Sequence, residues 1–144
     1  MTTTCAECGA VWPDDRTCET VYQECLVLEF SDPGYGAVHF LTVATFMLQH
    51  GRYSAAALAW VVPALRAYLA GETDVAGLRR SARALTHGTR AWKVARQPGE
   101  PPQRPVAWDH TLAEVAPHTV SAEAYGAAVT AWAARAVQQW TLPA

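Results

Sequence analysis

Residues 18–50 read CETVYQECLVLEFSDPGYGAVHFLTVATFMLQH, and this stretch predicts a helical hairpin. Its centre, residues 32–36 (DPGYG), has the composition of a turn, because Asp bonds its own backbone, Pro presets φ and Gly tolerates positive φ. On each side of the turn, four residues recur at the i, i+4, i+7 and i+11 spacing of one helix face. These residues are Cys18, Tyr22, Cys25 and Glu29 before the turn, and His39, Val43, Phe46 and His50 after it.

The same stretch predicts which side chains of the two helices face each other. If the helices run antiparallel, residues equally far from the turn lie opposite one another. We expect Asp32 and Pro33 at the N-cap and first turn of the second helix, and Gly51 at its C′ position. The predicted pairs are Cys18 with His50, Tyr22 with Phe46, Cys25 with Val43, and Glu29 with His39.

A metal site is predicted at the open end of this hairpin. Cys5 and Cys8 stand in the sequence CAECG, whose spacing places two thiolates on one tetrahedral ion. Cys18 and Cys25 cannot both join them, because seven residues separate their Cα atoms by about 10 Å along a helix. Two sulfurs on one zinc ion lie only about 4 Å apart.

The same helix geometry shows that the two histidines of the second helix cannot bind one ion together. Eleven residues between His39 and His50 correspond to about 16 Å of helix, so they cannot bind one ion. The predicted register brings His50 to Cys18. We therefore expect zinc to bind Cys5, Cys8, Cys18 and His50. In the alternative interpretation the four cysteines are reduced or disulfide-paired, and His50 is an ordinary core residue.

Around these residues the chain resembles a group of small bacterial proteins classed as a domain of unknown function. Their signature is CPxCG, then a cysteine, then E(Y/F)xDPxYxxVHxLTVxAYxxQHP. The matching residues here are Cys5 to Ala10, Cys18, Glu29 to Val43, and Gln49 with His50. The match is tight over the first third of the chain and looser beyond it. The resemblance supports the zinc ligands and implies no activity.

This chain departs from the family signature at three positions. Ala44 stands where the family has Asp, Gly51 replaces its Pro, and Trp60 falls where the third helix of the family carries a His. The resemblance therefore implies that part of any polar site shared by the family is missing here.

Charge and apolar content argue against a nucleic-acid-binding protein and against a membrane-spanning one. The net charge is −2 and no basic run occurs, so we expect no nucleic-acid partner, and Arg79, Arg80 and Arg83 are interpreted as a solvated helix face. Pro63 and Arg66 interrupt the longest apolar run, so we expect no membrane span. Without a signal peptide, cysteines in this arrangement favour metal binding in a reducing cytoplasm.

The whole chain of 144 residues is predicted to form one all-α domain, a compact bundle of about five helices. The segment before the last helix is rich in proline and therefore cannot form a long helix. We expect it to form an ordered strap anchored by Trp92 and Trp108. The predicted parts are 1–16 (knuckle and lead-in), 17–50 (hairpin), 53–88 (third and fourth helices), 89–120 (strap) and 121–141 (final helix).

Glu29 and His39 are the candidate catalytic residues. A carboxylate bound to one ring nitrogen fixes the tautomer and makes the other nitrogen a better base or metal ligand. A hydrogen bond that merely joins two helices is the alternative. Two functions follow: a small biosynthetic enzyme with structural zinc and a small-molecule pocket near Glu29 and His39, or a non-enzymatic, zinc-stabilised binding or interaction module. The common nucleotide-binding and hydrolase motifs do not occur.

Overall fold

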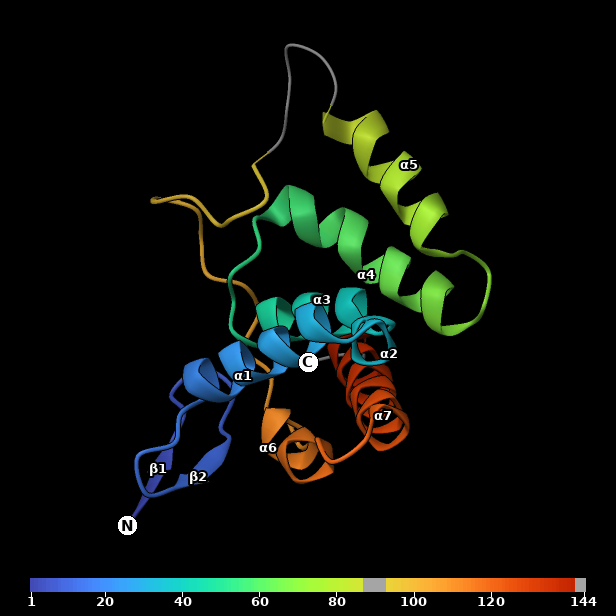
Figure 1. Cartoon of the computed structure of the whole chain (residues 1–144). Coiled ribbons are helices and arrows are strands. Elements are labelled where there is room, and N and C mark those ends of the chain that lie inside the picture. Colours follow the sequence, from blue (N-terminus) through green and yellow to red (C-terminus); the bar gives the residue numbers. More distant parts are fainter. Residues whose placement is uncertain (87–92, 142–144) are drawn as a thin grey trace.

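The computed structural model describes residues 1–86 and 93–141, and these are mainly helical (Figure 1). The elements are β1 (Thr2–Thr4), β2 (Val11–Pro13), α1 (Cys18–Ser31), α2 (Pro33–Gly36), α3 (His39–Gln49), α4 (Ala55–Leu69), α5 (Val75–Thr86), α6 (Leu112–Val115), a 3₁₀ turn (Ala116–His118) and α7 (Ala122–Thr141). The prediction of a helical fold is confirmed. Two details were wrong: β1 and β2 form a small sheet, and the described residues hold seven helices, of which α2 and α6 are only four residues long.

The N-terminal segment is a β-hairpin. Its strands run antiparallel, with Thr2 opposite Pro13 and Thr4 opposite Val11. The Cys5 N–H donates to the Ala10 carbonyl at 2.8 Å, and this bond closes the loop at the hairpin tip. Cys5 and Cys8 therefore lie on the tight loop at the tip of this hairpin, close to the first residue of α1 and the end of α3.

The turn between α1 and α3 is longer than predicted. Asp32 is an N-cap, since its carboxylate accepts from the Gly34 N–H at 2.8 Å, but it caps the short α2 rather than the second long helix. That helix, α3, begins at His39. Gly36 permits the tight passage, because a Cβ on it would lie 2.7 Å from the Glu29 carbonyl oxygen.

The other end of α3 follows the prediction. His50 is the C-cap residue, and Gly51 occupies the C′ position with φ +63°. This left-handed conformation favours glycine there.

Helix α7 is the central element of the core. It packs against α2, α3, α4 and α6, and its inner face is fully buried. Trp132 lies at the centre of this face and donates its indole N–H to the Gln49 side chain of α3 at 3.0 Å. This buried bond fixes α7 against the C-terminal half of α3.

Residues 93–111 extend across the ends of α3 and α7. Gln103 donates to the Leu48 carbonyl at 2.6 Å, and Gln49 donates to the His110 carbonyl at 2.7 Å. Trp108 packs partly buried against the core. The predicted anchor Trp92, and the end of the predicted fourth helix near residue 87, lie outside the described residues.

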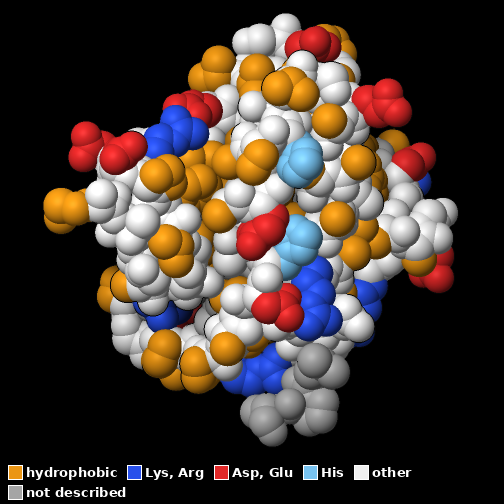
Figure 2. All heavy atoms as spheres, turned by 90° about the horizontal axis from the view of Figure 1, so that it is seen from below, with side chains coloured by type: hydrophobic (Ala, Val, Ile, Leu, Met, Phe, Trp, Pro, Cys, Tyr) orange, Lys and Arg blue, Asp and Glu red, His pale blue; other side chains and the backbone are white. Residues whose placement is uncertain are grey.

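Helix α5 lies along the outer side of α4 (Figure 1). The Trp60 indole of α4 donates to the Ser81 hydroxyl of α5 at 2.7 Å. On the face shown in Figure 2, acidic and basic side chains are interspersed with apolar ones. Among the described residues, no helix combines the length and the hydropathy needed to cross a membrane.

Candidate functional site

Four potential metal ligands meet where the hairpin contacts the helices. One ligand atom from each of Cys5, Cys8, Cys18 and His50 lies within 4.8 Å of every other. Tetrahedral zinc with bonds of about 2.3 Å places two sulfurs about 3.8 Å apart. The cluster therefore has the dimensions of a single metal site. Its members come from three segments: the hairpin tip, the first residue of α1 and the C-cap of α3.

The orientation of His50 is fixed by its neighbours. Its Nδ1 lies 2.7 Å from the Phe46 carbonyl oxygen, and because a carbonyl only accepts, Nδ1 must carry the proton. Its ring stacks on Phe46 with centroids 4.0 Å apart, and Phe46 stacks on Tyr22 at 3.8 Å. Nε2 is left with a lone pair, and it is buried without a hydrogen-bond partner in the described part of the chain. A buried unpaired nitrogen beside three sulfurs is what a metal ligand needs.

The sulfur of Cys18 lies in a polar environment. Cys8 Sγ is 3.5 Å away, and the Trp12 indole N–H donates to Cys18 Sγ at 3.2 Å. The hydrogen bonds from Cys8 and from Trp12 lower the pKa of the Cys18 thiol. A metal binds the thiolate form, so these donors favour the state that ligates.

The residues present fit a zinc ion. Three thiolates and one imidazole form a set typical of structural zinc, which takes four protein ligands and leaves no position for water. The hairpin loop is also held at its rim, where Arg52 and Glu7 form an ion pair at 3.1 Å.

Glu29 and His39 meet at the opposite end of α1 and α3. Glu29 Oε1 lies 2.7 Å from His39 Nδ1. The other oxygen accepts from the Thr42 hydroxyl at 2.6 Å and from the Tyr125 hydroxyl. The Glu29 side chain is fully buried, so these three donors replace its lost hydration. Burial, and then the bond to Glu29, raise the pKa of Tyr125, which keeps this phenol protonated as a donor.

His39 is placed between this buried carboxylate and a cavity. Its side chain is 42% exposed, and with Nδ1 bound to Glu29, Nε2 is the ring atom left for a ligand. The cavity beside it has a volume of about 500 Å³ and lies between α3, α4 and α5. Phe40, Trp60 and Leu78 contribute to its apolar walls. This volume lies within the range of small-molecule sites.

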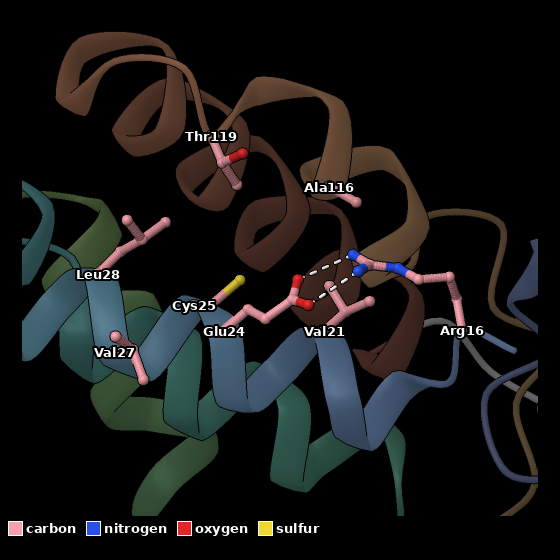
Figure 3. Close-up of a pocket in the computed structure, with 8 residues that line it drawn as sticks. All are labelled: Arg16, Val21, Glu24, Cys25, Val27, Leu28, Ala116 and Thr119. Carbon is pink, nitrogen blue, oxygen red and sulfur yellow. Dashed lines mark hydrogen bonds and ion pairs between the residues drawn. The ribbon is translucent and has the colours of Figure 1, made fainter.

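Cys25 belongs to neither site. It is fully buried and contributes to a second cavity of about 300 Å³ between α1 and the segment of Ala116 and Thr119 (Figure 3). Arg16 and Glu24 form an ion pair at 2.8 Å on the edge of that cavity. Burial raises the pKa of the Cys25 thiol. This side chain therefore stays protonated, and the protonated form is a weak nucleophile.

Two partners of Glu29 were not predicted from the sequence. Thr42 follows His39 by three residues, so it lies on the same face of α3, and this spacing could have identified it. Tyr125 comes from α7, far along the chain, and no local pattern connects it with Glu29.

Residues 3–141 match the family of unknown function DUF5946, and the chain belongs to this family. No curated protein and no solved structure matches it. The match confirms the resemblance to a domain of unknown function and supplies no activity. The signature motif itself stays a prediction.

Proposed function

We propose that Cys5, Cys8, Cys18 and His50 bind one zinc ion, and that its role is mainly structural. The observation that carries this proposal is the buried His50 Nε2, which has no hydrogen-bond partner among the described residues and is grouped with three cysteine sulfurs. Soft thiolates with one imidazole favour zinc over harder cations such as Mg²⁺ or Ca²⁺.

A structural ion has a clear task at this place. Strands of three residues with exposed threonines in β1 form a hairpin too small to be stable alone. Zinc binding supplies about 10–16 kcal/mol in small zinc-dependent peptides, far more than the single exposed ion pair of Arg52 with Glu7. The ion would join the hairpin to α1 and to α3 at once.

We infer further that the function of the protein lies in the cavity beside His39. Glu29 holds His39 Nδ1 and leaves Nε2 available to a ligand in a volume of about 500 Å³. This arrangement supports a small enzyme of a biosynthetic pathway, with His39 as general base and Glu29 as the residue that orients it. The closed coordination of the zinc ion supports placing the chemistry here rather than at the metal.

One observation favours the second candidate, a non-enzymatic interaction module. Val27 and Phe30 of α1 are 64% and 76% exposed, and exposed apolar side chains close together in sequence on one helix are suited to a protein partner. In that case the bond of Glu29 to His39 would serve only to join α1 and α3.

The metal proposal is tested by the zinc content of protein purified without added zinc. Cys18→Ser and His50→Ala should lose the metal, whereas Cys25→Ser, a matched change of a buried cysteine on the same helix, should keep it. Full zinc in the Cys18→Ser and His50→Ala proteins, or none in the wild type, would refute the ligand set.

The cavity proposal is tested by NMR with a library of small fragments. Hits should shift the imidazole signals of His39, and His39→Ala should stay folded with zinc while losing the hits. If no fragment shifts these signals and His39→Ala changes stability alone, the interaction module is the correct function.

A further inference from the structure

We propose that the cavity beside His39 takes a small organic anion with an apolar body, and that Arg79 binds its negative head group. This inference rests on the proposed function of the cavity and names the class of its ligand. The sequence alone suggested that Arg79 is part of a solvated face, but the structure places it on the wall of the cavity, across from α3.

The polar groups of the cavity are few, and each can be assigned. Glu29 is the only acidic residue on the described wall, and both its oxygens already accept hydrogen bonds from His39, Thr42 and Tyr125. Its charge is therefore stabilised by its own donors. The buried carboxylate presents no free acceptor to a cationic ligand.

Arg79 is the complementary case. Arg79 is the only Lys or Arg residue on the part of the wall that the structure describes, and no described residue forms a hydrogen bond or ion pair with its side chain. Guanidinium groups bind carboxylate and phosphate with two parallel hydrogen bonds. An anion would supply the partner that the described residues do not.

The remaining wall fixes the body of the ligand. The Trp60 indole N–H is bound to Ser81, so this side chain presents its ring rather than a donor to the cavity. Phe40 and Leu78 are apolar, and His39 Nε2 adds one hydrogen-bonding position. An apolar, preferably aromatic, body with one anionic head fits this set, whereas a sugar or a polyamine would leave polar groups unpaired.

The test uses four probes with a shared naphthalene body and calorimetric titration of the zinc-loaded protein. The heads are carboxylate (2-naphthaleneacetate), phosphate (2-naphthyl phosphate), hydroxyl (2-naphthaleneethanol) and ammonium (2-naphthaleneethylamine). We expect at least one anion to bind about tenfold more tightly than the alcohol, and the amine to bind most weakly. The comparison of the acid with the phosphate identifies the preferred head.

Arg79→Gln should remove this preference while leaving the affinity for the alcohol unchanged. Arg80→Gln, a matched change at the next residue, which is not on the cavity wall, should keep the preference. Equal binding of anion and alcohol, or a preference that survives Arg79→Gln, would overturn the assignment but leave the cavity as a ligand site. Absence of binding by all four probes would overturn the assignment together with the proposed cavity function.

Discussion

The hydroxyl of Tyr125 offers a direct test of the buried Glu29 site. Tyr125→Phe removes one oxygen and keeps the ring, which is fully buried and lies 5.4 Å from the Tyr35 ring. The lost hydrogen bond goes to a buried carboxylate, and bonds to charged groups contribute about 1.5–3 kcal/mol. Since Thr42 still donates to the same oxygen, we expect the free energy of unfolding to fall by about 2 kcal/mol.

The matched control is Tyr35→Phe. The Tyr35 hydroxyl donates at 2.9 Å to the neutral Thr119 carbonyl from a half-buried position, and its loss should cost about 1 kcal/mol or less. Urea unfolding at constant, verified zinc content measures both variants. For a chain of this size the Tyr125 variant should also melt about 4–8 °C lower. Equal losses for the two variants, or a loss below about 0.5 kcal/mol for Tyr125→Phe, would show that the carboxylate does not depend on this donor.

Three further outcomes are expected. Gly36→Ala should destabilise the protein by about 1–3 kcal/mol in urea unfolding, because its Cβ would meet the Glu29 carbonyl oxygen at 2.7 Å, and an unchanged midpoint would contradict this close approach. Thr17→Ala should cost about 1 kcal/mol by thermal melting, since it removes the N-cap of α1, whereas Thr17→Ser should be nearly neutral. Stability should fall as pH rises above about 10. The reason is that burial raises the pKa of Tyr22 to about 12 and raises that of Tyr53 as well. The unfolded chain therefore releases protons that the folded chain keeps. A free energy of unfolding that stays constant from about pH 10 to 12 would contradict this.

The grouping of Cys5, Cys8, Cys18 and His50 could be predicted because it depends on the spacing of Cys5 and Cys8 and on helix geometry. A rise of 1.5 Å per residue places Cys25 too far along its helix to share an ion with Cys18, and His39 too far along its helix to share one with His50. The antiparallel register then brings His50 to Cys18 as the fourth potential ligand. The Tyr22–Phe46 stack at 3.8 Å and the Glu29–His39 contact at 2.7 Å follow from the same register.

Other features depend on contacts that no local pattern records. The β1 and β2 strands have three residues each, too few for a period-two signal, and main-chain pairing defines them. Cys25 and Val43 line different cavities, and their predicted pairing across the two helices stays a prediction. Because α3 begins at His39 rather than near residue 33, the turn contains an additional short helix that the simple hairpin rule does not include.

The two candidate sites are linked by the register of α1 and α3, and this makes the register itself testable. The potential metal ligands lie at one end of the pair, the Glu29–His39 contact lies at the other, and the Tyr22–Phe46 stack lies between them. Sliding α3 by one residue would turn its side chains by about 100° and shift them by about 1.5 Å. Such a slip would separate His50 from the three sulfurs and His39 from Glu29 together. The two sites together therefore constrain the register of α1 and α3 more strongly than either site would alone.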